Sequence, residues 1–450
     1  MNDKTLIKNA RLVNEGSVSE GDLLIDNGRI SRIDRVIAAD HSMEVIDADG
    51  AWLLPGMIDD QVHFREPGLT YKAGIWSESR AAAAGGITSF MEMPNTNPAT
   101  VTLEALEDKY AIGAEKSLVN YSFYLGATND NLDVIRALQP GKAAGIKIFM
   151  GASTGNMLVD NEQTLAGIFR DAPALIATHC ESSPMIQRNL DAALERYGPE
   201  IPVTEHPNIR SAEACYQSTL VAQSLAREHQ APLHVLHLST AMEMDLFEPG
   251  PMEGKLITGE VCVHFLHFNA DDYPRLGNLI KCNPSIKTAA DQAAIIQALK
   301  DGRLDIIATD HAPHTSEEKA SSDYLKAPSG LPLVQDALLC VLELYHDGVL
   351  SPEDVVLRTA HNPAIRYKVK ERGFLREGYR ADLVLVDTES TTEVSNDRAL
   401  SKCGWTPFAG ETFRSRILAT LVNGQAVYRN GGIIEADAAQ RIQFGVQREL

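Results

Sequence analysis

Eight short apolar runs, separated by segments with helical periodicity, fill the middle of this 450-residue chain. The segments TLEALEDKYAIGAEKS and SAEACYQSTLVAQSLAREHQ are typical of amphipathic helices. Eight strands that alternate with helices predict an α/β protein with a (β/α)8 barrel, and a doubly wound open sheet is the alternative. The eight runs are LPGMIDDQVHF, GITSFMEMP, NYSFYLGAT, GIKIFMG, ALIATHC, PLHVLHLS, LITGEVCVH and LDIIATD.

The two ends of the chain have a different pattern, with short strands separated by Gly and Asn turns. The N-terminal end contains TLIKNARLV and DLLIDNGRISRIDRVI, and the C-terminal end contains ADLVLVDTE and RILATLVNGQAVYRNGGII. Both ends contain Asn-Gly pairs, which favour hairpin turns. We therefore expect a small composite β-sandwich built from residues 1–52 and 366–450, with the barrel over residues 53–365 between them.

The charge and composition exclude several classes of partner. The formal net charge is −20, which opposes binding to nucleic acid and to anionic lipid. No segment reaches the ~18 consecutive apolar residues of a membrane span, and the first residues lack an apolar signal core. We expect a cytoplasmic protein that binds neither nucleic acid nor membrane. The six cysteines are dispersed without a CxxC pair, so no disulfide framework is expected.

Five residues that can bind metal lie in or at the ends of separate apolar runs: His63, Lys147, His179, His237 and Asp310. In a parallel barrel, catalytic groups come from the C-terminal edge and are contributed by several strands. Imidazole and carboxylate are common zinc ligands, and a lysine carboxylated on its amine becomes an anionic carbamate. We predict these five as ligands of a metal centre, with Asp310 also acting as the catalytic general base. Without the histidines, Lys147 would be interpreted as a side chain that reaches the strand end.

The motif DDQVHFREPG places three polar residues on one face of a strand. Alternate side chains of a strand point the same way, so Gln61, His63 and Arg65 should all face the barrel axis and its mouth. His63 can bind metal there, and Arg65 can form two parallel hydrogen bonds with a carboxylate. A lone histidine on a strand would more often be a hydrogen-bonded core residue, and only the accompanying residues favour a ligand.

Three further histidines lie near the predicted ligands. His234 is three residues before His237 and is expected on the opposite side of its strand. His311 should face away from Asp310, and we interpret both as structural. His314 lies further into the following loop, where it can meet a substrate.

The ordered motifs of the chain resemble those of the dihydroorotases of the amidohydrolase superfamily. The resemblance covers nearly the whole chain, and FREPG, MPNTNP and DHAPHT in that order are its specific part. It implies a metal-dependent (β/α)8 barrel that carries a composite β-sandwich. The implied reaction is reversible hydrolysis of the cyclic amide of (S)-dihydroorotate to N-carbamoyl-L-aspartate, in de novo pyrimidine (UMP) biosynthesis. The motifs are DDQVHFREPG, MEMPNTNP, KIFMGASTGNMLV, THCE, HLST, CNPSIK, ATDHAPHT and SKCGWTPFAG.

The resemblance also implies roles for the metal ligands. It implies one or two zinc ions per chain, bridged by a hydroxide and by Lys147 carboxylated from CO2. His63 and Asp310 match the ligands of one ion, and His179 and His237 match those of the other.

A second group of residues matches substrate contacts of the family. Arg65, Asn95 and His314 match groups that hold the substrate carboxylate, and Asn283 matches a further substrate contact. Ser153 and Thr154, in the loop after the fourth strand, are predicted to close over the substrate.

One position departs from the family pattern. The family usually has His-x-His on the first strand, and Gln61 stands here at the first position. An amide oxygen is a poorer zinc ligand than imidazole, so the site with His63 and Asp310 should bind metal more weakly. Gln61 can ligate through its oxygen, a water can replace the missing ligand, or the site can work with one tightly held metal.

Two other functions stay open. A catalytically silent paralogue could act as a scaffold for a carbamoyltransferase, and a related cyclic amidase could act on hydantoins or allantoin. Arg65, Asn95 and His314 speak against the second, because those substrates lack a carboxylate at the matching point. The expected partner is a small molecule, dihydroorotate or N-carbamoyl-aspartate, and a homo-oligomer is expected.

Overall fold

The middle of the chain forms a series of short parallel strands in chain order. The computed structural model describes residues 4–151 and 156–449. Each of the eight predicted apolar runs contains a strand, which confirms their prediction, and Tyr124 divides the third run into two strands. These strands are β6 (Met57–Val62), β7 (Ile87–Glu92), β8 (Asn120–Phe123), β9 (Leu125–Gly126), β10 (Ile146–Phe149), β11 (Ile176–His179), β12 (Leu233–Val235), β13 (Ile257–Cys262) and β14 (Ile306–Ala308).

The pairing of these strands follows their order in the chain. β6, β7 and β8 form one sheet, and β9 to β14 form a second sheet in sequence order. Every pair within the two sheets is parallel, as expected where helices cross between successive strands. A parallel bridge between Val62 and His311 joins the end of β6 to the segment after β14. The strand order is therefore the one that the barrel prediction requires.

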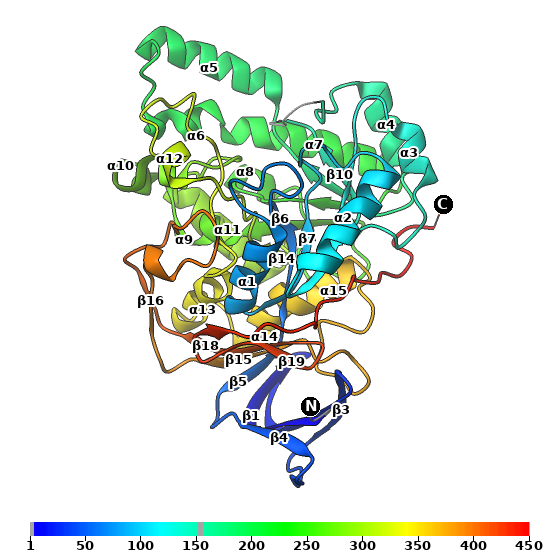
Figure 1. The fold of residues 1–450 in the computed structure, drawn as a ribbon. Helices are drawn as coiled ribbons and strands as arrows, with labels where there is room; N and C mark the ends of the chain where they lie inside the picture. Colours follow the sequence, from blue (N-terminus) through cyan, green and yellow to red (C-terminus); the bar gives the residue numbers. More distant parts are fainter. Residues whose placement is uncertain (1–3, 152–155, 450) are drawn as a thin grey trace.

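Helices occupy the connections between the strands, and Figure 1 shows them around the parallel strands. Local caps explain several of their ends: the Thr102 side chain accepts a hydrogen bond from the Ala105 backbone, and α11 ends at left-handed Gly302. The two helices expected from the sequence are confirmed as α2 and α7. The α-helices are α1 (Ile75–Ala84), α2 (Leu103–Lys116), α3 (Leu132–Ala137), α4 (Glu162–Asp171), α5 (Ser183–Tyr197), α6 (His206–Ile209), α7 (Ala212–Glu228), α8 (Ala241–Met244), α9 (Val263–His267), α10 (Tyr273–Leu276), α11 (Ala289–Asp301), α12 (Ser316–Lys319), α13 (Ala337–His346), α14 (Pro352–Val356) and α15 (Asn362–Arg366).

The two ends of the chain meet in a separate, nine-stranded sheet, drawn at the bottom of Figure 1 in blue and in orange to red. Within it, β5 pairs with β1 from the N-terminal end and with β15 from the C-terminal end. This arrangement is consistent with the expected β-sandwich. Its strands are β1 (Lys4–Asn14), β2 (Ser17–Asp26), β3 (Arg29–Asp34), β4 (Met43–Asp47), β5 (Trp52–Pro55), β15 (Leu383–Asp387), β18 (Arg416–Val422), β19 (Gln425–Arg429) and β20 (Gly432–Ile433), and a separate pair is formed by β16 (Thr392–Glu393) and β17 (Thr412–Phe413).

Three Asn-Gly pairs form hairpin turns in this sheet, as their sequence predicts. Asn27, Asn423 and Asn430 have φ values of 51°, 47° and 52°, and the glycine after each also has positive φ. Left-handed φ at both central residues suits the right-handed twist of the flanking antiparallel strands. The turns join β2 to β3, β18 to β19 and β19 to β20.

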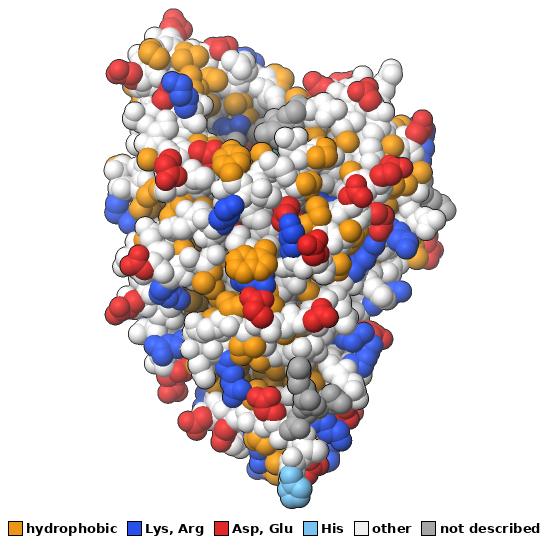
Figure 2. Space-filling model, viewed as in Figure 1, with side chains coloured by type: hydrophobic (Ala, Val, Ile, Leu, Met, Phe, Trp, Pro, Cys, Tyr) orange, Lys and Arg blue, Asp and Glu red, His pale blue; other side chains and the backbone are white. Residues whose placement is uncertain are grey.

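The surface carries mixed charges and one clear hollow. Figure 2 shows acidic and basic side chains interspersed over one face, and a hollow below α5 with Lys or Arg side chains in its depth.

Among the described residues, no helix combines the length and the apolar character needed to cross a membrane.

Candidate metal and substrate site

The predicted metal ligands form two close pairs. His63 Nε2 lies 3.1 Å from Asp310 Oδ1, and His179 Nδ1 lies 2.9 Å from His237 Nε2. Two ligand atoms of one tetrahedral zinc ion are about 3.4 Å apart, given zinc–nitrogen bonds of about 2.0–2.1 Å. Each pair therefore has a spacing suited to a shared ion, and the pairing agrees with the division expected from the sequence.

Neighbouring side chains orient the nitrogen atoms of both pairs. His63 Nδ1 donates to Asn95 Oδ1 at 2.7 Å, which leaves the Nε2 lone pair facing the Asp310 carboxylate. His179 Nε2 donates to Glu181 Oε2 at 2.8 Å, which leaves Nδ1 unprotonated toward His237. Metal-binding histidines are commonly oriented by such hydrogen bonds. Because His63 Nε2 and Asp310 Oδ1 are then both acceptors, a cation between them would satisfy both.

The protonation states of these groups also suit metal binding. Burial lowers the pKa values of His63, His179 and His237, so all three are neutral imidazoles near pH 7. Burial alone would raise the pKa of Asp310, but the polar groups around it, including His63, His264 and Lys147, outweigh burial, and the pKa is lowered. The site therefore offers neutral imidazoles and an ionised carboxylate, which are the forms that bind metal.

Lys147 lies within β10 and is 1% exposed. Its charge acts on both pairs, because it contributes to the pKa shifts of His63, His179, His237 and Asp310. Burial lowers the pKa of Lys147 to about 8. An appreciable fraction of the amine is then neutral near pH 7.5, and the neutral amine is the form that reacts with CO2. Carboxylation of Lys147 stays a prediction.

Gln61 is engaged at both ends of its amide. Its Nε2 donates to Asp310 Oδ1 at 3.1 Å, and its Oε1 accepts a weak hydrogen bond from Cys262 Sγ at 3.7 Å. The Gln61 amide thus acts as a donor to the predicted catalytic carboxylate in this arrangement, and its oxygen faces a thiol.

Three of the predicted substrate contacts lie next to the His63–Asp310 pair: Arg65, Asn95 and His314. Arg65 Nε donates to Pro313 O at 3.1 Å, and Arg65 Nη2 lies 3.1 Å from His314 Nε2. The structure thus brings Arg65 and His314 together, while Asn95 contacts His63. Asn283 Oδ1 is buried and has no hydrogen-bond partner among the described residues. The predictions for Ser153 and Thr154 fall on residues outside those that the structure describes.

Positive φ values mark three of the site residues. Arg65, His237 and Asp310 have φ values of 69°, 42° and 52°. Residues other than glycine rarely adopt this left-handed region, and such residues cluster at functional sites, where the surrounding structure stabilises them. This backbone strain is independent support for a functional site at these strand ends.

Sequence reasoning missed two residues that support the site. Glu181 accepts from His179 and pairs with Arg210, so it orients one predicted ligand and connects it to a cation. Lys72 Nζ lies 2.8 Å from His314 Nδ1. Glu181 is two residues after His179 in THCE, and Lys72 is seven residues after Arg65 in REPGLTYK. This proximity in sequence to a predicted site residue was the signal that could have identified them.

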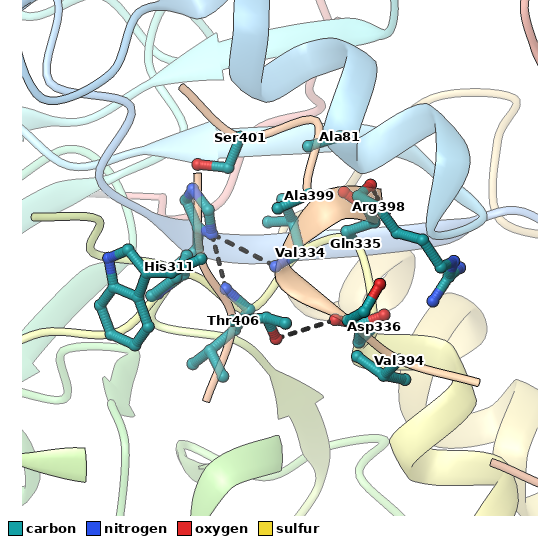
Figure 3. A pocket seen from close by; sticks show the side chains of 14 residues that line it. Ala81, His311, Val334, Gln335, Asp336, Val394, Arg398, Ala399, Ser401 and Thr406 are labelled. Carbon is teal, nitrogen blue, oxygen red and sulfur yellow. Dashed lines mark hydrogen bonds between the residues drawn. The ribbon is translucent and has the colours of Figure 1, made fainter. Parts of the chain in front are cut away.

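His311 lies in a different environment. Its Nε2 donates to Glu78 at 2.8 Å, and its Nδ1 accepts from the Leu333 backbone at 2.8 Å. Figure 3 shows it lining a small cavity between the loop at residues 332–336 and the segment around residues 394–406. The cavity volume is about 10 Å³, which is about the space of one water molecule. His311 therefore anchors Glu78 of α1 and the loop at residues 332–336 to the segment that carries Asp310.

A second group of ligand-type residues lies deeper in the protein. Asp60, His234 and Glu260 each place one ligand atom within 4.8 Å of the others, and all three are fully buried. Burial lowers the pKa of His234, but hydrogen bonds and charges from Asp60 and Glu260 raise it to about 9. A protonated imidazole cannot ligate metal. This triad therefore suits a buried proton better than the catalytic ion, which also needs an open coordination position.

The Asp60→Asn variant should separate these two interpretations. We expect an unchanged zinc content and a loss of stability on the order of 3 kcal/mol, because one charge partner of a buried ion is removed. The loss should be largest below the unfolded-state pKa of about 6.5 and should shrink as the pH rises toward 9, where His234 loses its proton. Thermal unfolding at several pH values, with metal analysis, checks this. A loss of bound zinc in Asp60→Asn would instead assign the ion to the triad.

Comparisons with known proteins agree on one family. The chain matches the model of the Amidohydrolase family over residues 213–427 and the Dihydro-orotase-like model over residues 50–144. It is 32% identical to a dihydroorotase of Methanothermobacter thermautotrophicus over 438 residues, which cover 96% of this chain and 95% of the relative. It is also 32% identical to an allantoinase of Deinococcus radiodurans over 434 residues, covering 95% of each chain.

The solved structures point to the same fold. The L-hydantoinase from Arthrobacter aurescens superposes with a TM-score of 0.91 and is 27% identical, with 98% of this chain and 99% of that chain covered. This hydantoinase therefore shares the architecture described above, and the two sequence relatives carry two other names.

Proposed function

This chain belongs to the amidohydrolase family, as a dihydroorotase-like hydrolase that acts on cyclic amides, and from that premise we propose that it is a dihydroorotase. The proposed reaction is the reversible hydrolysis of the cyclic amide of (S)-dihydroorotate to N-carbamoyl-L-aspartate, in pyrimidine biosynthesis. The proposal includes a closed (β/α)8 barrel over residues 53–365 as the catalytic unit, with residues 1–52 and 366–450 as the β-sandwich.

The observation that carries the choice of substrate is a group of cations beside the metal ligands. Arg65, Lys72 and Lys319 all contribute positive charge at His314. Lys72 is paired with Glu318 at 3.0 Å, but buried Arg65 forms no salt bridge with any described residue. A substrate with a carboxylate would supply that partner, and dihydroorotate carries one on its ring. Hydantoin and allantoin lack that carboxylate.

The donor set described above fits a pair of divalent ions. We propose that His63 and Asp310 hold one ion, that His179 and His237 hold the other, and that carboxylated Lys147 contributes to both. When bound, zinc lowers the pKa of water toward about 7 and polarises an amide carbonyl.

The side chains of this protein supply the remaining steps. Arg65 binds the substrate carboxylate and orients the ring. Asp310 accepts a proton from the attacking water and then delivers it to the ring nitrogen as the carbon–nitrogen bond breaks. The hydrogen bond from Gln61 Nε2 holds the Asp310 carboxylate in place during this exchange. In the reverse direction, Asp310 removes the proton from the carbamoyl nitrogen during ring closure.

The direct test compares three substrates. Purified protein with zinc and bicarbonate should hydrolyse dihydroorotate with a kcat/KM far above that for hydantoin or allantoin. The relatives named allantoinase and the hydantoinase structure make those two compounds the relevant competitors. Preference for either would overturn the proposal in favour of another cyclic amidase. Zinc-loaded protein that turns over none of the three would indicate a silent paralogue.

Dependence on bicarbonate tests the role of Lys147. Protein stripped of metal in CO2-free buffer should regain full activity only when zinc and bicarbonate are both supplied, because the carbamate requires CO2. The Lys147→Met variant should lose at least about 10²-fold in kcat and should bind less zinc, since a metal ligand is removed. Lys300→Met, at an exposed position of α11, is the matched control. Full recovery with zinc alone would refute carboxylation.

A further inference from the structure

His314 is held between two cationic side chains. Lys72 Nζ lies 2.8 Å from its Nδ1, and Arg65 Nη2 lies 3.1 Å from its Nε2. The same Nε2 lies 3.1 Å from the backbone oxygen of Ser329. The ring is largely buried, with 9% of its side chain exposed.

These contacts determine where the proton of His314 sits. A lysine ammonium can only donate, so Nδ1 must accept from Lys72 and carries no proton. The single proton of the neutral ring is then on Nε2, from which it is donated to the Ser329 oxygen. Arg65 is also a donor only, so its Nη2 faces an N–H group without an acceptor between them. Two donors that converge in this way suit a bound carboxylate, which would accept from both in addition to the backbone oxygens of Ser329 and Pro313.

The charges around the ring keep this arrangement in place. Lys72 forms an ion pair with Glu318 Oε1 at 3.0 Å, which holds the ammonium against the imidazole. Burial and then the charges of Arg65, Lys72 and Lys319 lower the pKa of His314 far below its ordinary value. Glu318 Oε2 is 3.6 Å from Nδ1 and is the acidic group that faces the ring.

We propose that Lys72 is a positioning residue that locks His314 as the Nε2–H tautomer, so that His314 donates alongside Arg65 to the carboxylate of the substrate. The inference rests on the proposed function for the identity of the ligand. The tautomer itself is a property of the protein without substrate. Lys72 acts through His314 and need not touch the substrate.

The Lys72→Met variant tests the proposal through kinetics. At pH 8 its KM for dihydroorotate should rise about 10-fold or more while kcat changes little, because His314 can then place its proton on either nitrogen. Lys72→Arg keeps a cation that can only donate at this position, so its KM should return to within a few-fold of the wild-type value. A fall of kcat together with kcat/KM in Lys72→Met, or a Lys72→Arg variant no better than Lys72→Met, would overturn the proposal.

A spectroscopic measurement tests the same point without activity. Nitrogen-15 NMR of the histidine rings in substrate-free protein, with His314→Gln for assignment, should show the Nε2–H form of His314 in the wild type. In Lys72→Met the resonances should shift toward a mixture of tautomers, and in Lys300→Met they should be unchanged. An identical tautomer in Lys72→Met and wild type would overturn the proposal. If the wild type does not hydrolyse dihydroorotate, the proposed function fails, while the NMR result still decides the role of Lys72.

Discussion

Asp310→Asn is expected to lower kcat for dihydroorotate by at least about 10³-fold. The amide cannot accept the proton of the attacking water, and it is a poor ligand for a divalent ion. The carboxylate accepts a hydrogen bond from Gln61 Nε2 at 3.1 Å and lies 3.1 Å from His63 Nε2, so the substitution also removes one ligand of the His63–Asp310 pair. Steady-state kinetics with zinc and bicarbonate in excess measures the effect.

Metal analysis of the same variant separates the two roles of Asp310. Loss of zinc together with activity indicates mainly a ligand, and retained zinc with lost activity indicates mainly a proton acceptor. Asp133→Asn, with a side chain that is 95% exposed, is the matched control and should behave as wild type. An Asp310→Asn enzyme within 10-fold of wild-type kcat would refute the catalytic assignment.

Arg65→Met is expected to lower kcat/KM for dihydroorotate by about 10³-fold and to change the substrate preference. The guanidinium is buried beside the site, 8% exposed, and its Nε is held by Pro313 O. Loss of one partner of a buried charge pair is costly, because the substrate carboxylate would keep the His314 donor but lose its cationic partner. Hydantoin has no carboxylate at that point, so its kcat/KM should change only a few-fold.

The ratio of the two kcat/KM values is the decisive readout for Arg65. General damage to the fold would lower both values together, whereas loss of carboxylate recognition lowers one. Arg136→Met, at a surface position with 44% side-chain exposure, serves as the control. Equal losses for dihydroorotate and hydantoin would contradict the proposed role and would favour a substrate without a carboxylate.

The strands and turns could be predicted because their signals are local. The run ALIATHC forms β11, and the Asn27-Gly28 pair makes a hairpin turn with two positive φ values. These features depend on hydrophobic patterning and on backbone preferences of a few adjacent residues. The division of NYSFYLGAT at Tyr124 was not predictable from local patterning, and there the Tyr124 hydroxyl hydrogen-bonds two distant groups, the backbone oxygen of Asp60 and the Tyr367 hydroxyl.

In the site too, features set by adjacent residues could be predicted, and features set by residues far apart in the chain could not. Strand alternation placed Gln61, His63 and Arg65 on one face, and all three contact residues 310–314 in the structure. The sequence did not indicate that His234 lies between Asp60 and Glu260, since these carboxylates come from two other strands.

The amino-acid sequence by itself determined the order of strands and helices, the ends that pair into one sheet, and the residue types available for metal and carboxylate binding. Only the tertiary structure decided which side chains orient the ligands, and which nitrogen of each histidine carries its proton. Asn95 is 32 residues from His63, and Lys72 is 242 residues from His314. The physical reason is that protonation and tautomer depend on burial and on the nearest donors and acceptors, and folding brings those neighbours from distant parts of the chain.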